Sequence, residues 1–305
     1  MSWKKLGLVK APARANTWQH SHAYTPTPIR LNDEIFRIFV SFLDKKKVGR
    51  VGFVDVSAQD PTTILNISET PSLDIGEPGA FDDNGVTPVS VVRDGDDLRL
   101  YYIGWQLCEQ VRYMLFVGLA ASTDNGETFS RIQKVPILER SQDEMIVRTA
   151  ANVMCDQDLW RMWYIAGSET ILVNGKVTPT YSMKYAESKN GIDWPSEGKL
   201  IMSPQGSDEY GFGRPYVLNN DAGFEMWYSI RSHTRGYHIG YATSSNGIDW
   251  ARKDDIATLE ASTDGWDSEM IAFGGICDSP DHRFIFYNGN GFGRDGFGVA
   301  EWISD

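Results

Sequence analysis

Residues 226–250, MWYSIRSHTRGYHIGYATSSNGIDW, contain the pattern that decides the fold. An aromatic segment, 226–229, is followed by a segment of small residues and then by a Ser-x-Asn-Gly-x-x-Trp segment around Gly247. Closely similar Asn-Gly segments occur around Gly126 and Gly191, and an aromatic segment precedes each of them. Asn and Gly tolerate the positive φ of a tight hairpin turn, so each copy predicts two β-strands joined by a turn.

The tyrosines of the aromatic segments measure the length of the repeat. A weaker copy at 38–42 precedes the first of them, so five copies of one unit fill the chain. The four tyrosines, 62, 64 and 59 residues apart, are Tyr102, Tyr164, Tyr228 and Tyr287.

Each unit is interpreted as four antiparallel strands. In the second unit an inner strand at 86–92 precedes the aromatic strand, a small-residue strand follows at 117–122, and the Asn-Gly turn leads into an outer strand. Small residues on one strand face allow neighbouring sheets to pack closely. The prediction is an all-β fold, a five-bladed β-propeller of four-stranded blades. The alternative is a row of five separate hairpin modules.

The fifth unit lacks an outer strand, because the chain ends soon after residues 296–302. The N-terminal segment 2–10 aligns with the segments that begin at Trp194 and Trp250. We therefore expect residues 2–10 to form the outer strand of the last blade and to cover a sheet edge. Residues 1–305 are then a single propeller domain.

Composition limits the partners of the protein. The chain has 305 residues and a net charge of −12, which argues against nucleic acid or an anionic membrane as the main partner. It has no apolar run long enough to span a membrane and no secretory signal. Its three cysteines form neither a disulfide framework nor a zinc signature. We expect a cytoplasmic protein without a metal or other cofactor.

The repeated Ser-x-Asn-Gly-x-x-Trp segments, as in 188–194 and 244–250, make the whole chain similar to the five-bladed propellers of glycoside hydrolases. These include enzymes of the arabinanase and xylosidase type, the invertase and levansucrase type, and the mannoside phosphorylases. The resemblance implies that a sugar binds at the mouth of the central channel, where carboxylates of the innermost strands act on the glycosidic bond. The ligand would be a carbohydrate or a sugar nucleotide.

The three carboxylate positions that the resemblance implies are empty. The Asp-Pro of the first blade would fall at Thr25 or Thr27, the Glu-x-Pro at Gly213, and the mid-chain Asp-Pro near Thr149. Either other carboxylates perform the chemistry, or the protein is not a glycosidase of that type.

Other carboxylates precede the inner strands of blades two to five. One carboxyl group of a pair can protonate the leaving oxygen while the other acts as base or nucleophile. Glu209 is the first choice for the general acid, because Tyr210 and Phe212 beside it would raise its pKa. Its partner across the channel would be Glu144 or Asp83. The acids in such positions are Asp82, Asp83, Glu144, Glu209 and Glu269.

Arg148 and Arg214 occupy equivalent places on two inner strands. An inward arginine can clamp a carboxylate or phosphate, which would suit an anionic sugar or a nucleotide sugar. The alternative is internal pairing with Glu144 and Glu209.

Several polar residues in loops or at strand ends are candidate ligand contacts. His22 and Tyr24 lie in the first unit, while His233 and Arg235 fall in the connection after the aromatic strand of the fourth. Asn288 begins a glycine-rich segment that has no phosphate-loop lysine.

Two functions remain open from the sequence. The first is an enzyme that cleaves or transfers a glycosyl group at the channel mouth. The second is a non-catalytic propeller that recognises a glycan or sugar nucleotide after loss of the hydrolase carboxylates.

Overall fold

The computed structural model describes residues 2–10, 18–256 and 259–303. The described chain is almost entirely β-strand, with one four-residue helix, α1 (Asn290–Gly293). The first sheet contains β2 (Ser21–Arg30), β3 (Ile35–Leu43), β4 (Gly49–Ser57) and β5 (Ile64–Ile67), paired in that order. All its strand pairs are antiparallel.

An eight-stranded sheet follows, made of two antiparallel halves. A short parallel pairing of Val147 and Arg148 with Leu115 and Phe116 joins them. The first half is β6 (Val86–Asp94), β7 (Asp97–Leu107), β8 (Tyr113–Ser122) and the two-residue β9 (Ser130–Arg131). The second half is β10 (Val147–Asp156), β11 (Leu159–Gly167), β14 (Ser182–Ser188) and β15 (Lys199–Met202). A separate hairpin of β12 (Thr170–Val173) and β13 (Lys176–Pro179) is inserted between β11 and β14.

Two four-stranded antiparallel sheets complete the described fold. One is β16 (Glu209–Asn220), β17 (Gly223–Ser232), β18 (Gly236–Ser244) and β19 (Ala251–Arg252). The other is β20 (Ala272–Asp278), β21 (Arg283–Asn288), β22 (Phe297–Ile303) and β1 (Ser2–Lys10).

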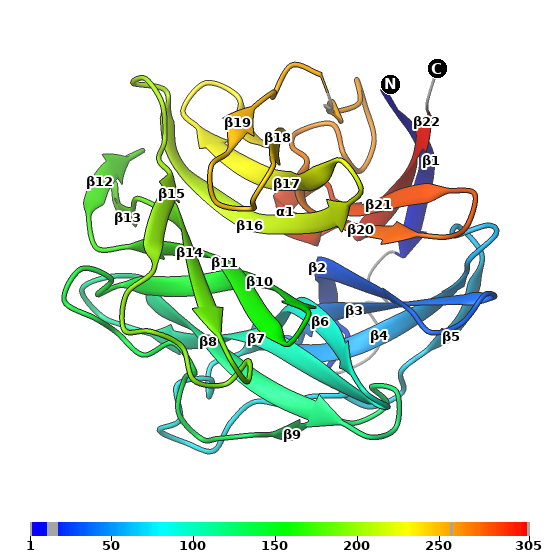
Figure 1. Cartoon of the computed structure of the whole chain (residues 1–305), viewed down its shortest axis with the longest axis horizontal. Helices are drawn as coiled ribbons and strands as arrows, with labels where there is room; N and C mark the ends of the chain where they lie inside the picture. Colours follow the sequence, from blue (N-terminus) through cyan, green and yellow to red (C-terminus); the bar gives the residue numbers. More distant parts are fainter. Residues whose placement is uncertain (1, 11–17, 257–258, 304–305) are drawn as a thin grey trace.

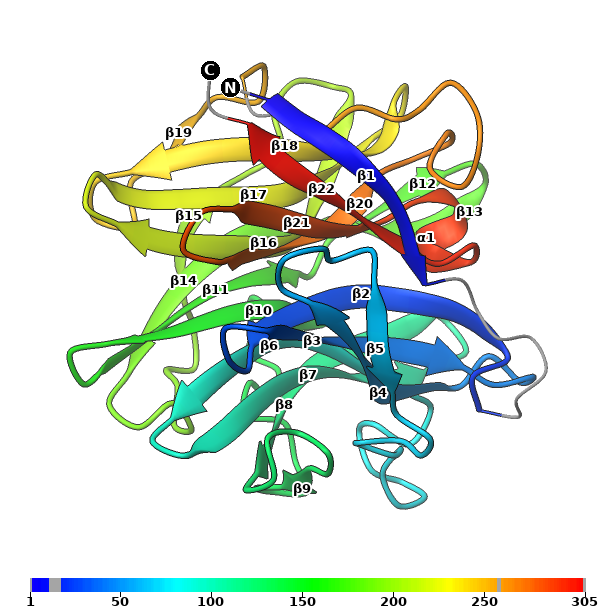
Figure 2. The same ribbon diagram turned by 90° about the vertical axis from the view of Figure 1, so that its right-hand side faces the viewer.

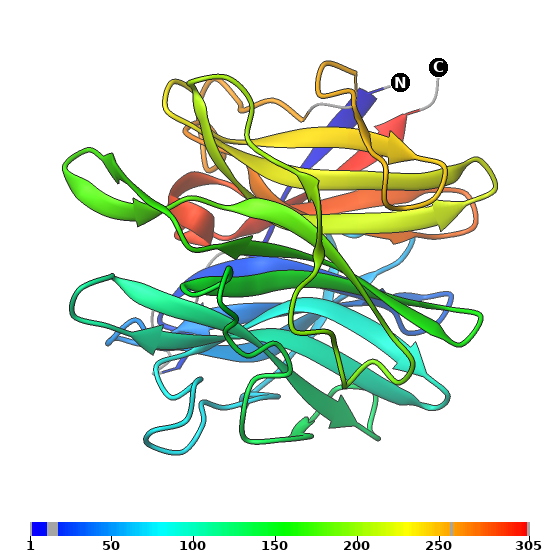
Figure 3. The ribbon, with the colours of Figure 1, turned by 60° about the vertical axis from the view of Figure 1, so that its left-hand side comes forward.

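The first strands of these groups lie together in the middle of the molecule (Figure 1). Strand β2 contacts β6 and β20, while β10 contacts β6 and β16, and β16 contacts β20. These contacts form a closed cycle, so the same end of every group faces a common axis. The hairpin β12–β13 and helix α1 lie at one end of the sheets, on the left of Figure 3.

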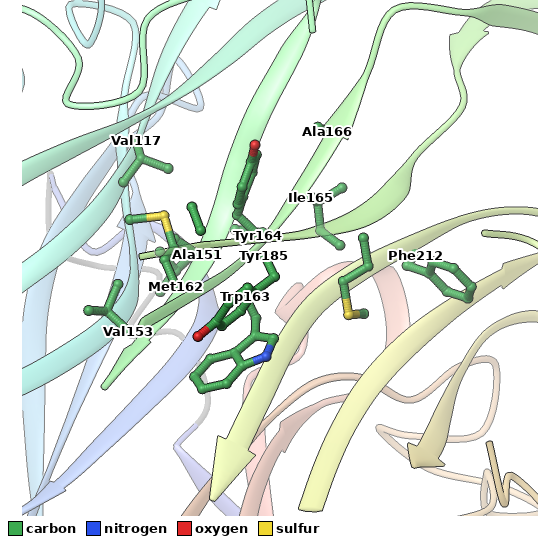
Figure 4. Close-up of a cluster of buried hydrophobic side chains, with 14 of the residues drawn as sticks. Val117, Ala151, Val153, Met162, Trp163, Tyr164, Ile165, Ala166, Tyr185 and Phe212 are labelled. Carbon is green, nitrogen blue, oxygen red and sulfur yellow. The ribbon is translucent and has the colours of Figure 1, made fainter. Parts of the chain in front are cut away.

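The repeat tyrosines explain why small residues recur on the third strand of a group. A Cβ on Gly118 would lie 2.3 Å from Cζ of Tyr102, and one on Gly240 would lie 2.8 Å from Cε2 of Tyr228. Any larger residue there would displace the ring, so glycine is required by close approach. Around Tyr164 the interior is filled by aromatic and aliphatic side chains, including Met162 and Trp163 (Figure 4).

The Asn-Gly segments fasten each group to its neighbour. Glycines 126, 191 and 247 have positive φ, as the sequence predicts for these turns. The carbonyl of the preceding asparagine accepts a hydrogen bond from an arginine on the second strand of the previous group. These pairs are Arg37 with Asn125 at 3.0 Å, Arg99 with Asn190 at 2.6 Å and Arg161 with Asn246 at 3.3 Å.

The N-terminal strand occupies the position expected from the sequence. Strand β1 pairs antiparallel with β22 and is the outer strand of the last sheet (Figure 2). Its Trp3 is buried and packs edge-on against Trp302 and Trp227, with ring centroids 4.8 and 6.1 Å away. Residues 2–10 therefore cover apolar surface as well as a sheet edge.

Replacing Trp3 with alanine should destabilise the protein by about 3–5 kcal/mol, because the change leaves a cavity beside two tryptophans. Lys4→Ala is the matched control, since Lys4 is exposed on the same strand and should change stability by less than about 0.5 kcal/mol. Urea denaturation measures both variants. Equal midpoints for the two would show that the N-terminal strand contributes little to the fold.

Candidate functional site

A carboxylate accepts a hydrogen bond from each repeat tyrosine, and a basic residue pairs with the same carboxylate; three of these carboxylates are buried, and that of Asp254 is 29% exposed. In the first sheet Phe39 occupies the equivalent position, 63 residues before Tyr102, and has no hydroxyl. The four sets, with the distance of the tyrosine bond, are Tyr102–Asp82–Arg131 (2.9 Å), Tyr164–Glu144–Lys184 (2.9 Å), Tyr228–Asp254–Arg252 (2.7 Å) and Tyr287–Asp267–Lys5 (2.9 Å). In three of the sets the acid that precedes an inner strand is thus used in packing between strands, whereas Asp254 follows β19.

Glu144 belongs to this network. It is fully buried and ion-pairs with Arg148 and with Lys184, whose Nζ lies 2.6 Å away. Arg148 also donates to the carbonyl of Glu139, and it is 2% exposed. Of the two roles considered for Arg148, internal pairing with Glu144 is the one that this geometry favours. Neither group presents a free polar atom to a ligand.

Asp82 and Asp83, adjacent in sequence, lie in different environments. Asp82 is fully buried between Tyr102 and Arg131. Asp83 is half-buried and accepts a hydrogen bond from the Gly79 amide at 2.8 Å, which fixes the loop before β6. Neither aspartate is positioned as the partner of Glu209.

The expectation of a raised pKa for Glu209 is wrong. Burial acts to raise it, but hydrogen bonds from Arg252 and from the Gln205 amide outweigh burial and hold the pKa of Glu209 below its usual value. Arg252 binds both carboxylate oxygens, at 2.6 and 2.9 Å. Glu209 therefore stays ionised at neutral pH and has no proton to give as a general acid.

Glu269 lies at the surface. Its side chain is 63% exposed, and its nearest charged partner among the described residues is Arg294, 3.9 Å away. The carboxylates expected to face one another across a channel thus lie in four different environments. Glu144 is buried beside Tyr164, and Glu209 is bound by Arg252. Asp83 fixes a loop, and Glu269 is exposed to solvent.

Arg214 lies on the axis, but its donors are used within the protein. Its guanidinium, 1% exposed, donates to carbonyls of Val89 (3.3 Å), Pro26 (2.6 Å) and Phe273 (2.9 Å), and to the hydroxyl of Thr27 (3.0 Å). Burial lowers the pKa of Arg214 to about 10, so the group remains charged at neutral pH. It does not pair with Glu209, contrary to one alternative from the sequence.

Asn288 is also a structural group. It is fully buried, its side-chain oxygen accepts from the Thr25 amide at 2.7 Å, and its amide donates to the carbonyls of Ala23 and Gly296. These bonds tie the last sheet to the first.

Gly213, where the sequence resemblance implies a glutamate, has no room for a large side chain. A Cβ on Gly213 would lie 3.2 Å from the ring of Phe273 and 3.7 Å from that of Tyr237. A glutamate there would have to displace Phe273. The backbone of Phe273 has a φ of +57°, which is rare for a large residue and costs of order 1–3 kcal/mol. Strained residues of this kind are concentrated at functional sites.

Phe273 belongs to a group of rings that we call the aromatic cluster. It lies at the end of the sheets where β2, β16 and β20 begin, and its members come from every group of strands. Most are half-buried, and Phe292 is 38% exposed. The cluster consists of Tyr24, Trp105, Tyr113, Tyr181, Tyr210, Tyr237, Phe273 and Phe292.

Contacts between the rings hold the cluster together. The Phe273 ring lies 5.2 Å from Tyr24, 5.7 Å from Tyr237 and 6.0 Å from Phe292, measured between centroids. The Trp105 indole donates to the hydroxyl of Thr87 at 2.9 Å. Of the expected ligand contacts, Tyr24 is thus brought into a common site with residues of other sheets.

Arg231 lies beneath the tyrosines of the aromatic cluster. The carbon of its guanidinium is 4.2 Å from the ring centre of Tyr181 and 4.5 Å from that of Tyr210. Arg231 is not among the residues predicted from the sequence. Three residues after each of the other repeat tyrosines stand Trp105, Gly167 and Asn290, so a cation at this place is peculiar to the fourth unit. That difference is the signal that would have identified it.

The remaining predicted contacts lie around the cluster. His233 is exposed and packs on the ring of Tyr210, while Arg235 is exposed and pairs with Glu260. His22 is half-buried, and burial, followed by the charges of Lys47 and Arg294, lowers its pKa.

An open pocket of about 450 Å³ lies beside the aromatic cluster, between the third and fourth groups of strands. Tyr210 and His233 form part of its wall, together with Glu169 and Glu209. Over residues 2–10, 18–256 and 259–303, no cluster of three or more His, Cys, Asp or Glu side chains forms a metal site. Within the same ranges, no helix has the length and apolar character needed to cross a membrane.

No known family model matches the chain. The uncharacterized protein Rv1502 of Mycobacterium tuberculosis is 34% identical over 300 residues, covering 98% of this chain and 99% of that protein. A solved glycoside hydrolase superposes with a TM-score of 0.77 at 17% identity, covering 99% of this chain and 92% of the other. A solved member of a family of mannoside phosphorylases, which contains glycoside hydrolases that target β-1,2-mannosidic linkages, gives 0.70 at 14%, with 98% and 93% covered. The fold is therefore that of glycoside hydrolases.

Glu209→Gln should lower the free energy of unfolding at pH 7 by about 1–2 kcal/mol, between the values for exposed and buried charged pairs. Because folding lowers the Glu209 pKa, this contribution is complete above the usual glutamate pKa of roughly 4.3. It is lost as the pH falls through the lower folded-state value. The difference between wild type and variant should therefore shrink from pH 5 towards pH 3.

Glu260→Gln, in the exposed pair with Arg235, serves as the control for this measurement by urea denaturation. It should show no difference from wild type at any pH. A wild-type advantage over Glu209→Gln that stays constant down to pH 3 would contradict the assignment of the lowered pKa.

Proposed function

Because this chain belongs to the same family as protein Rv1502 of Mycobacterium tuberculosis and has the fold of glycoside hydrolases, we propose that it recognises a carbohydrate at the aromatic cluster. The whole chain, residues 1–305, forms one five-bladed propeller in this proposal. Its blades are the two halves of the eight-stranded sheet and the three four-stranded sheets. The closed cycle of contacts among β2, β6, β10, β16 and β20 supports the blade count.

The convergence of aromatic rings from all five groups of strands, most of them half-buried, is the observation that carries this proposal. Aromatic faces pack on the C–H groups of a sugar ring, and tyrosine hydroxyls supply hydrogen bonds to its hydroxyl groups. Apolar and aromatic surface with a few placed polar groups is the usual lining of a small-ligand site. The cluster also lies at the end of the inner strands, where the sequence resemblance puts the sugar.

Recognition without cleavage is the form of the function that the geometry supports better. A glycosidase of the usual kind needs one carboxylic acid and one carboxylate on opposite sides of the bond. Asp82 and Glu144 are buried in tyrosine networks, and Glu209 is held ionised by Arg252. Gly213, where the sequence resemblance to glycoside hydrolases implies a glutamate, is covered by Phe273.

Phe292→Ala should weaken glycan binding about three- to tenfold, because it removes the most exposed ring of the cluster while leaving buried contacts intact. Leu172→Ala is the control, since Leu172 is 71% exposed on the inserted hairpin and lies outside the cluster. An array that includes β-1,2-mannosides, other neutral glycans, uronic acids and sugar nucleotides identifies the ligand. Isothermal titration then compares the variants. Equal affinities of wild type and Phe292→Ala for the identified ligand would reject the cluster as the site.

Glycosyl cleavage or transfer is the second candidate function, and the pocket beside the cluster is the observation that favours it. Glu209 and Glu169 both line this pocket with His233. An ionised Glu209 suits a nucleophile or a base.

Hydrolysis of aryl glycosides, aryl mannosides included, tests the cleavage function. If Glu209 acts in it, Glu209→Gln should reduce turnover about 10²-fold or more, while Glu260→Gln retains full turnover. No turnover by wild type on any aryl glycoside, with glycan binding intact, would leave recognition as the function.

A further inference from the structure

Arg231, near the end of β17, is 5% exposed, and its guanidinium is surrounded by tyrosine side chains. Its guanidinium carbon lies over Tyr181 at 4.2 Å, over Tyr210 at 4.5 Å and over Tyr237 at 5.8 Å. Tyr113 belongs to the same group of tyrosines, because its hydroxyl lies 3.3 Å from that of Tyr181. The charge therefore lies at the centre of four phenol groups.

The donors of Arg231 are poorly satisfied. Nη1 donates to the carbonyl of Pro179 at 3.0 Å, and the guanidinium hydrogen-bonds the hydroxyl of Tyr237. Nε is buried and has no acceptor. The titratable side chains that act most strongly on Arg231 are tyrosines, not carboxylates. Burying a charged group without an anionic partner is unfavourable, so the fold alone does not account for this arrangement.

Other buried arginines have an acid partner or more acceptors than Arg231. Arg214 places hydrogen bonds on carbonyls of three other strands, and Arg148 pairs with Glu144. Arg37 binds Asp55 through two nitrogens, at 2.7 and 2.8 Å. Arg231 is the exception among these, since it has neither a carboxylate nor a full set of acceptors.

The surrounding tyrosines do not supply the missing negative charge. Burial raises the pKa of Tyr181, and it raises that of Tyr237 to about 12 even though the charge of Arg231 opposes it. Both are neutral at physiological pH and act as hydroxyl donors. A cation surrounded by neutral donors, without an acid, is the composition of an anion site.

We propose that Arg231 and the tyrosine hydroxyls around it bind an anionic substituent of the carbohydrate ligand, a carboxylate or a phosphate group. The proposal rests on the proposed recognition of carbohydrate at the aromatic cluster. A planar guanidinium with an unused Nε–H matches the oxygens of either group. Entry requires rotation of half-exposed Tyr210, whose outer neighbour is exposed His233.

The stability of Arg231→Met separates this role from a structural one. Methionine keeps much of the volume and removes a buried unpaired charge, so its melting temperature should stay within about 3 °C of wild type or rise. Arg214→Met, which breaks a satisfied set of bonds, should melt far below wild type. A fall in Arg231→Met as large as that of Arg214→Met would overturn the proposal.

Binding provides the direct test, using matched probes that differ only in the anionic group. These are methyl glucuronide with methyl glucoside, and mannose 6-phosphate with mannose, each measured by isothermal titration. Wild type should prefer the charged member of at least one pair by about tenfold to a hundredfold. Arg231→Met should lose the preference and keep the affinity for the neutral member. Arg140→Gln, which removes an exposed cation, should keep it.

Inorganic phosphate alone distinguishes failure of this inference from failure of the proposed function. Equal binding of charged and neutral sugars by wild type would overturn the anion site and leave carbohydrate recognition standing. Phosphate that binds wild type but not Arg231→Met, with no sugar bound by either, would support the anion site and reject carbohydrate recognition. A preference for the charged sugar that survives in Arg231→Met would assign it to another residue and overturn the proposal.

Discussion

The buried guanidinium of Arg214 is the interaction on which the centre of the structure depends. From β16 it reaches β2, β6 and β20, and it binds carbonyl groups whose own strands leave them without partners at the axis. Because a guanidinium is planar with donors on every side, one residue satisfies acceptors that converge from several directions. The charge that makes Arg214 resemble a ligand clamp in the sequence is the property that lets it hold inner strands together.

The need to satisfy buried polar groups also explains where the acids lie. Each repeat tyrosine after the first group brings its hydroxyl into the interior, where it needs an acceptor. A carboxylate meets that need, and a basic residue from the third or fourth strand of the group offsets its charge. Lys5 of the N-terminal strand does this for the last sheet, so that strand completes a polar network as well as a sheet. The acids used here are then unavailable at the channel mouth.

The end of the inner strands is consequently aromatic. Phe273 adopts a positive φ and covers the place where the resemblance would put an acid, and the rings of other groups pack around it. Beneath them, Arg231 is held without an anion. Strain and an unsatisfied charge in one region are unfavourable for folding, which fits a surface shaped for a ligand more than one shaped for stability.

The sequence by itself determined the repeat, the all-β class, the Asn-Gly turns and the N-terminal outer strand, because these follow from local spacing and from the one strand missing at the end. The tyrosine spacing placed two of the network acids, Asp82 and Glu144, among the predicted residues, and Glu269 was predicted two residues from Asp267. Asp254, the acid of the fourth unit, was not predicted. Only the tertiary structure decided which charges are paired. The charged partner of Glu209, Arg252, is 43 residues away, and the acceptors bound by Arg214 are 59 residues or more away. Pairing, burial and pKa depend on how sheets dock, and no local pattern records that.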